Sequence, residues 1–123
     1  MAKWVNVNAT DALLNYIKTN CTVLSACATQ PTDGTQCATT YALGTLGYTT
    51  TNITLAAGDA ANSRKITAAA ATIAVAATGT VSHFGFTNIG TLLAVATCVP
   101  TSVTSGGTVI MSAFDIDEVG TIT

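Results

Sequence analysis

Electric charge is scarce in this chain, and the scarcity limits how its surface can be built. The 123 residues include four Lys and Arg and six Asp and Glu, so 8% are charged, whereas 49% are hydrophobic. An ordinary soluble domain carries about 25% charged residues. The other polar residues are mainly Thr, Ser and Asn, and β-branched Thr suits exposed strand faces. Burying such faces costs less desolvation free energy than burying charged surfaces. The composition therefore favours a β domain that packs against neighbours.

The chain has the length of one domain, whose core would bury about two-thirds of the surface that the unfolded form exposes. Turn signals separate short segments rich in Thr and Val, which is typical of antiparallel strands. We therefore predict one structural domain over residues 1–123. It should be a mainly β, small antiparallel β-sandwich or barrel-like fold with one short N-terminal α-helix at about 10–19 and a β-rich part at 21–117.

One segment near the N-terminus has helical periodicity. Apolar side chains cluster on roughly one helical face between Thr10 and Asn20. Thr10 is a suitable N-cap, while Asp11 near the positive end of the helix dipole and Lys18 near its negative end favour the same placement. We expect a short helix after Thr10.

The rest of the chain has strand periodicity interrupted by turns. Residues 31–34, 88–90 and 105–107 are predicted turns, and Pro100 should stop a strand. Residues 39–47 show no clear periodicity, and Gly44 and Gly47 suggest an irregular connection there. Strands are predicted at 21–28, 53–56, 64–70 and 72–76 (two strands or one bent strand), 80–87, 91–99 and 108–117. In the last of these strands, both faces carry apolar residues, so both faces should be covered.

The charge pattern argues against two classes of partner. Arg64 and Lys65 are the one adjacent basic pair, too few for a nucleic-acid-binding patch. The most apolar stretch, residues 66–77, is too short to cross a bilayer, and the first residues lack the apolar stretch of a signal peptide. We expect the chain to fold in the cytoplasm and to bind no nucleic acid, membrane or small-molecule substrate.

Four cysteines leave two alternatives open. Cys27 and Cys37 flank a short loop that a disulfide could close, leaving Cys21 and Cys98 to pair with each other or with a neighbouring chain. Cys21 and Cys27 would lie about 20 Å apart on one strand and so need different partners. The other alternative is four buried free thiols. Without a C-x-x-C pair, and with His83 distant in sequence, no metal or cofactor is predicted.

No pattern of catalytic residues emerges. Ser82 precedes His83, but neighbouring residues on a strand point to opposite faces, so we expect the two not to act together and the imidazole to be structural. Asp115, Asp117 and Glu118 form one acidic group without the partners of a calcium or acid–base site, and we interpret it as a solvated chain end. The prediction is a protein that is not an enzyme.

Four aromatic side chains are candidate core or interface anchors. Core packing is favoured for Trp4 because Trp is highly buried on average. Phe84 and Phe86 share one strand face and would lie in the core or, in an oligomer, at the central contact. Phe114 in the last strand is the fourth candidate.

Several stretches spread over most of the chain carry a family resemblance. They are the opening Met-Ala-Lys-Trp-Val-Asn with Asp-Ala-Leu-Leu-Asn-Tyr-Ile-Lys-Thr-Asn, then Gln-Pro-Thr, Thr-Thr-Tyr-Ala-Leu-Gly, Ser-Arg-Lys-Ile-Thr, Ala-Thr-Gly-Thr-Val-Ser-His-Phe-Gly-Phe and Thr-Leu-Leu-Ala-Val-Ala-Thr-Cys. Together they resemble small virion proteins of tailed bacteriophages, often encoded near the major capsid gene. The resemblance implies a head decoration or cement protein, or a related particle component.

Composition and resemblance lead to one hypothesis with two alternatives. The chain is expected in the virion as a homo-oligomer, a trimer at quasi-threefold positions, that binds neighbouring subunits of the major capsid protein. A tail, collar or spike component of the same particle is the first alternative. A small glycan-binding adhesin module is the second, although one Trp and three Tyr offer little aromatic surface for it.

Overall fold

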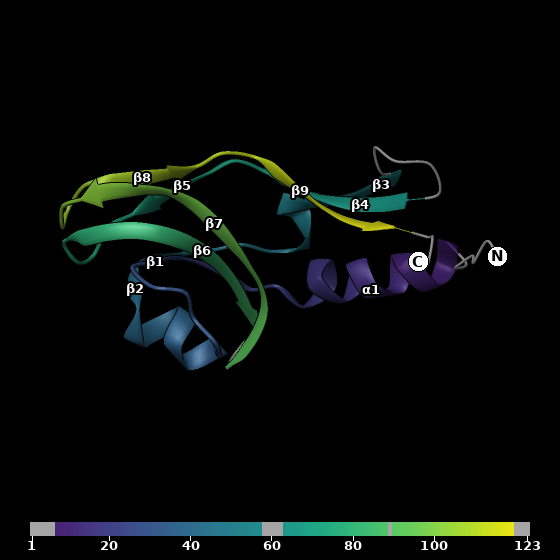
Figure 1. The fold of residues 1–123 in the computed structure, drawn as a ribbon, viewed down its shortest axis with the longest axis horizontal. Helices are drawn as coiled ribbons and strands as arrows, with labels where there is room; N and C mark the ends of the chain where they lie inside the picture. Colours follow the sequence, from purple (N-terminus) through teal and green to yellow (C-terminus); the bar gives the residue numbers. More distant parts are fainter. Residues whose placement is uncertain (1–6, 58–62, 89, 120–123) are drawn as a thin grey trace.

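A computed structural model describes residues 7–57, 63–88 and 90–119. They form a mainly β fold with antiparallel sheets and one α-helix, as the sequence predicts (Figure 1). The elements are α1 (Val7–Asn20), β1 (Val23–Cys27), the π-helical turn η1 (Gln36–Thr40), β2 (Ala42–Gly47), the 3-10 turn η2 (Thr50–Asn52), β3 (Ile53–Ala57), β4 (Ser63–Ala68), β5 (Ala71–Ala74), β6 (Gly79–Asn88), β7 (Thr91–Val103), β8 (Thr108–Met111) and β9 (Phe114–Val119).

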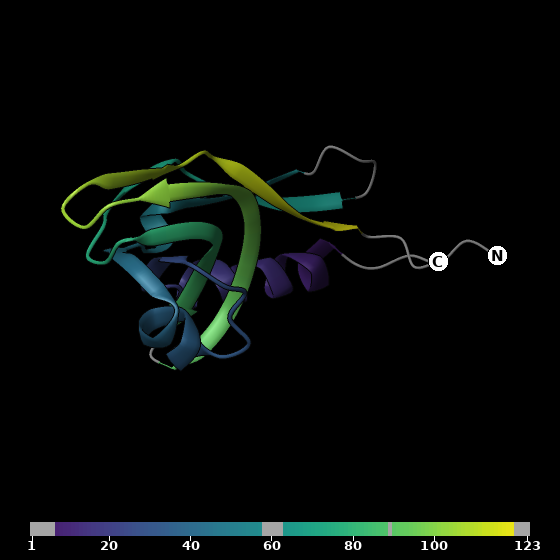
Figure 2. The ribbon, with the colours of Figure 1, turned by 60° about the vertical axis from the view of Figure 1, so that its left-hand side comes forward.

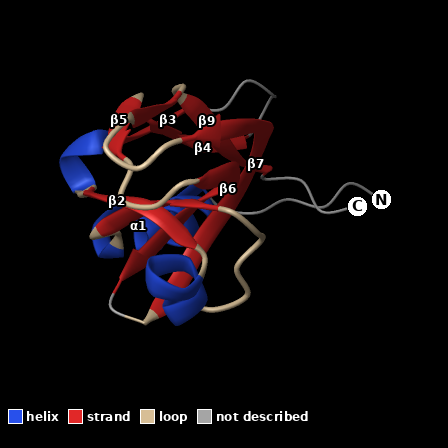
Figure 3. Ribbon diagram, turned by 90° about the vertical axis from the view of Figure 1, so that its left-hand side faces the viewer, coloured by secondary structure: helices blue, strands red, loops and turns tan. Residues whose placement is uncertain are grey.

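The strands form two layers (Figures 1 and 3). One layer is a four-stranded sheet in the order β2-β1-β6-β7. The other consists of β3-β4-β9 and the pair β5-β8. Because β4 leads into β5 and β8 into β9 across two residues each, the second layer is in effect one long bent ribbon. Opposite this ribbon lie the four-stranded sheet at one end of the molecule and α1 at the other (Figure 1).

The helix is fastened to the ribbon by apolar and polar contacts. It packs against β3, β4 and β9, and buried Leu14 joins the same core cluster as Ile53 and Ile66. Nε of Arg64 on β4 donates to Oδ1 of Asp11 at 2.6 Å. The Lys18 ammonium donates to the backbone oxygen of Thr50 at 2.9 Å and to its hydroxyl at 2.7 Å. This end of the molecule is therefore covered from within the chain.

Between the sheet and the ribbon lies the rest of the core. Strand alternation turns Leu24 and Ala26 of β1 and the two phenylalanines of β6 to the inner face, as their shared cluster shows. Phe86 lies at the centre, with its ring 5.5 Å from that of Tyr48 and 5.7 Å from that of Phe114. Aromatic burial of this kind contributes about 1.5–3 kcal/mol per side chain.

The outer face of the four-stranded sheet is covered by the segment around η1 (Figure 3). Ser25 and Cys27 of β1 point to this face, and Cys37 of η1 packs onto them from outside. Gly85 of β6 lies directly beneath Cys37, where a Cβ atom would collide with the sulfur. Gly34 is pressed against the backbone of Gly90 in the same way. Two glycines thus let this segment approach the sheet closely.

Two predicted boundaries in the first half are wrong. The helix starts at Val7, so Thr10 is an internal helical residue and not the N-cap. Residues 39–47 are not irregular, because η1 ends at Thr40 and β2 occupies Ala42–Gly47. Gly44 lies within that strand, and a side chain at this position would collide with the backbone of Ala74. The glycine signals a close approach of backbones, not a loop.

Pro100 does not stop a strand, since β7 runs on to Val103. Val81 of β6 pairs with Thr101, whereas His83 pairs with Thr97, so β7 carries extra residues between these pairs. Pro100 falls within this bulge. A proline is tolerated there because the missing N–H breaks no regular ladder hydrogen bond and because β7 is the last strand of its sheet.

The predicted last strand at 108–117 is broken into β8 and β9 at Ser112 and Ala113. Within β8, Val109 and Met111 are buried, but Ile110 is 69% exposed. The expectation that both faces are covered is therefore wrong for the single chain.

Candidate functional site

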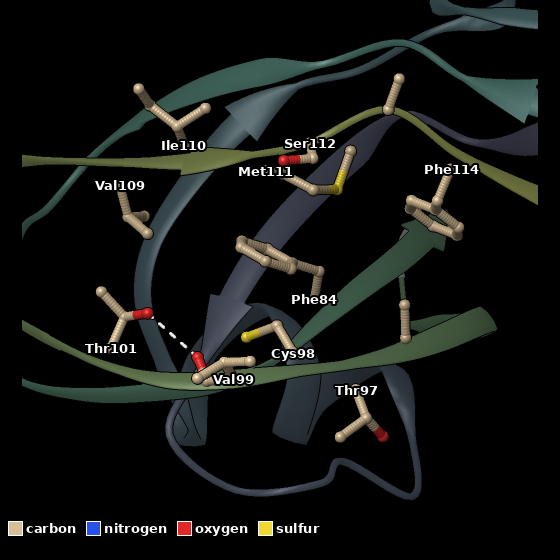
Figure 4. Close-up of a pocket in the computed structure, with 12 residues that line it drawn as sticks. Phe84, Thr97, Cys98, Val99, Thr101, Val109, Ile110, Met111, Ser112 and Phe114 are labelled. Carbon is tan, nitrogen blue, oxygen red and sulfur yellow. Dashed lines mark hydrogen bonds between the residues drawn. The ribbon is translucent and has the colours of Figure 1, made fainter.

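On one side of the sandwich, β7 runs beneath the ribbon of β8 and β9 (Figure 2). A groove of about 430 Å³ is lined by residues of these strands (Figure 4). Its walls come from β6, β7, β8, the link between β8 and β9, and the start of β9. The lining residues are Phe84, Ala96, Thr97, Cys98, Val99, Thr101, Val109, Ile110, Met111, Ser112, Ala113 and Phe114. None of these described residues carries a charge.

The floor of the groove is part of the hydrophobic core. Phe84, Val109 and Met111 are buried and belong to the main cluster, while Cys98 and Phe114 pack against it half-buried. Burial also raises the pKa of the Cys98 thiol. The groove is thus an opening into the core and not a shallow surface feature.

Two aliphatic side chains beside the groove are exposed. Val99 on β7 is 83% exposed. Ile110 on β8 is 69% exposed, and its side chain points away from the groove, to the opposite face of β8 from Val109 and Met111 (Figure 4). Complete burial of such a side chain is worth about 1.5–3 kcal/mol. A partner that covered both would gain this free energy without removing water from an ion.

The backbone around the groove offers strand edges. β7 is the last strand of the four-stranded sheet, and β8 and β9 are the last strands of the pair and of the three-stranded sheet. An edge strand has N–H and C=O groups on one side that can pair with an added strand. Apolar lining and available backbone groups therefore occur together in this part of the described chain.

The predicted aromatic anchors divide between core and groove. Phe86 is a core residue, 1% exposed. Phe84 belongs to the core cluster and also lines the groove. Phe114 packs its ring at a tilt against that of Phe86 and lies at one end of the groove (Figure 4). Trp4 lies outside the described residues.

All four cysteines are free thiols in this structure. The sulfur atoms of Cys27 and Cys37 nevertheless lie 3.9 Å apart. Of the alternatives left open by the sequence, a pairing of Cys21 with Cys98 within one chain does not fit this geometry. Cys21 lies beside Thr87, whereas the Cys98 thiol points to the carbonyl of Val81 at 3.8 Å, and six residues of β6 span about 20 Å.

Ser82 and His83 do meet, contrary to the sequence argument, because the strand is irregular between Val81 and His83. The Ser82 Oγ lies 2.7 Å from Nδ1 of His83 and donates to the carbonyl of Ala28 at 2.9 Å. A hydroxyl has one proton, so donation to Ala28 makes Nδ1–H of His83 the donor in the other bond. In this arrangement the imidazole cannot accept the serine proton, and the pair ties β6 to the loop after β1.

The acidic group near the C-terminus belongs to β9, and Asp115 in it is exposed. In register, Asp115, Asp117 and Glu118 lie opposite Thr67, Lys65 and Arg64 of β4. Asp115 accepts hydrogen bonds from the Thr67 hydroxyl at 2.8 Å and from the Lys65 ammonium at 3.1 Å. These bonds lower the pKa of the Asp115 carboxyl. In the described part of the chain, no three His, Cys, Asp or Glu side chains gather to hold a metal.

Comparison with models of known protein families, with curated proteins and with solved structures finds no match to this chain. No helix among the described residues has the length and apolarity needed to span a membrane. The groove was not predicted from the sequence, although one signal pointed to it: apolar residues on both faces of residues 108–117.

Proposed function

We propose that this chain is a non-enzymatic structural subunit that binds copies of itself and a larger protein shell, as a head decoration or cement protein of a tailed bacteriophage. One observation supports the proposal most directly: the uncharged groove lies between β7 and β8–β9, which are edge strands. Its chemistry suits a protein partner better than a polar small molecule.

The groove suggests how a neighbour would be held. A strand from the partner would pair with the edge of β7 or of β8 and would place apolar side chains over Phe84 and Met111. Val99 beside the groove would become buried in the contact. Specificity would come from the backbone pairing and from the fit of side chains in the groove.

The low charge of the whole chain supports the same reading. With ten charged residues among 123, most of the surface can be covered without desolvating ions. A homo-oligomer, which we propose is a trimer at quasi-threefold positions, would clamp neighbouring subunits of the major capsid protein. Because it would bind only the assembled shell, it would stabilise that state by mass action.

The proposal is tested on particles assembled with and without the chain. We expect particles with it to withstand higher temperature and to carry a copy number close to that of the capsid subunits. The Val99→Lys variant places a charge at the groove rim and should bind these particles at least tenfold more weakly. Tyr16→Lys, which changes an exposed side chain on α1, serves as the matched control and should bind normally. Equal heat resistance with and without the chain would refute the proposal.

The copy number also separates the two structural alternatives. A few copies per particle, located by microscopy at the tail, collar or spike, would move the proposal from the head to that component. Retention on a glycan array, lost on changing exposed polar or aromatic residues, would favour the adhesin module instead.

A further inference from the structure

The second buried cluster of the molecule lies outside the main core, between the four-stranded sheet and the η1 segment. Cys27 at the end of β1 and Cys37 in η1 are both 0% exposed, and neither belongs to the main hydrophobic cluster. Their sulfur atoms lie 3.9 Å apart, and the Cys27 sulfur lies 3.4 Å from the Cys37 carbonyl oxygen. Ten positions of sequence separate the two residues.

The surroundings hold the two sulfur atoms toward each other. Gly85 leaves space for the Cys37 sulfur directly above the β6 backbone, and a larger residue there would displace it. Ser25 lies on the same face of β1, fully buried, and its hydroxyl makes no well-aligned hydrogen bond. A buried hydroxyl without a firm partner is costly.

We propose that Cys27 and Cys37 are an oxidation site, at which a disulfide closes the η1 segment onto the outer face of the sheet. The sulfur atoms need to approach from 3.9 Å to the bonding distance of about 2.05 Å. Side-chain rotation and a small shift of η1 supply a movement of this size.

The protonation of the pair suits exchange with a small disulfide. The Cys27 thiol donates toward the Cys37 sulfur, which lowers the pKa of Cys37 and raises that of Cys27. Nearby Ser25 also favours the Cys37 thiolate. Cys37 is therefore the first nucleophile and Cys27 the second, and the two protons leave one after the other.

The exchange is balanced with oxidised glutathione as the oxidant. The Cys37 thiolate attacks one glutathione sulfur, forms a mixed disulfide and releases one glutathione thiolate. Cys27 then loses its proton to solvent and attacks the Cys37 sulfur, which releases the second glutathione. The protein loses two hydrogen atoms, and the oxidant is reduced to two glutathione molecules.

Access to the buried pair comes from local opening of the segment before η1. Pro31 and Gly34 are buried, but most of the neighbouring side chains from Ala28 to Thr35 are exposed, so the segment buries little apolar surface. Segments of this kind open at lower free energy than the core. The bond would form during folding or during such openings once the chain meets an oxidising medium.

The test is refolding of the full chain in glutathione buffers of increasing oxidised fraction, followed by acid quenching, denaturation and alkylation of the remaining thiols. Intact mass and peptide mapping should show one disulfide joining Cys27 and Cys37, with Cys21 and Cys98 alkylated. Because the bond closes a short loop, Tm should exceed that of the reduced chain by about 10 °C.

Two variants serve as a matched pair. Cys98→Ser should keep the oxidant-dependent rise in Tm, and Cys27→Ser should lose it. If Cys27→Ser does not fold, peptide mapping of the wild type and of Cys98→Ser still decides the question. Four alkylated thiols at every buffer ratio, a bond between another pair, or equal Tm in both buffers would overturn the proposal. None of these outcomes depends on the proposed capsid role.

Discussion

The two ends of the sandwich differ in how far their apolar side chains are buried. Around α1, Leu14, Ile53 and Ile66 are at most 3% exposed, and an ion pair between Arg64 and Asp11 closes the contact. Around β7 and β8, a groove runs into the core and apolar side chains stand exposed beside it. The comparison indicates that the first end supplies stability to the single chain, whereas the second end is suited to association.

The largest expected effect contrasts Ile66 with Ile110. Ile66→Ala should lower the free energy of unfolding by about 3 kcal/mol because it leaves a cavity beneath α1. Ile110→Ala removes an exposed side chain and should change it by less than about 0.5 kcal/mol. Urea unfolding of both variants at a concentration where the chain is monomeric measures the difference. Similar losses for the two variants would abolish the distinction between the ends.

An alkaline titration compares the thiols of the two ends. Burial raises the pKa of Cys21 from 9.0 to about 11, so between these values the unfolded chain has lost a proton that the folded chain keeps. Stability should therefore be fully present below pH 9.0 and fall as the pH rises toward about 11, by about 2 kcal/mol from this group. Thermal unfolding of Cys21→Ala should show a shallower alkaline decline than that of Cys98→Ala. Identical declines in the two variants would contradict the prediction.

The smallest effect concerns Asp115, which is exposed on β9. Thr67 and Lys65 hold the pKa of this carboxyl below its ordinary value of 3.8. Its contribution should be present above pH 3.8 and disappear as the pH falls through the lowered value in the folded chain. Denaturant unfolding of wild type and Asp115→Asn should differ slightly at neutral pH and converge in acid. A difference that persists or grows in acid would show that Asp115 stabilises the chain in another way.

Much of this fold follows from local sequence signals. The turns at residues 88–90 and 105–107 and the Thr-rich segments between them predicted β6, β7 and β8 because turn chemistry and strand alternation act over a few residues. The bend between β4 and β5 was also anticipated. By contrast, β2 was missed. Gly44 is required by the close approach of the Ala74 backbone, which is distant in sequence, and no local sequence pattern reveals this contact.

The candidate site was harder to predict than the strands. Phe84 and Phe114 were identified as anchors, but a groove depends on how far β7 separates from β8. The bulge around Pro100 and the break at Ser112 both lie at this groove. The meeting of Ser82 and His83 has the same origin, since ideal strand alternation fails at an irregularity. Register irregularities are set by tertiary packing and leave little trace in one sequence.

The central claim is that the uncharged groove is covered by another protein chain, first of all by a second copy. Sedimentation velocity of the full chain over a wide concentration range tests it most directly. We predict a concentration-dependent oligomer for wild type and for Tyr16→Lys, and a monomer with unchanged Tm for Val99→Lys. Wild-type protein that stays monomeric at every concentration, or a Val99→Lys variant that associates as wild type does, would contradict the account.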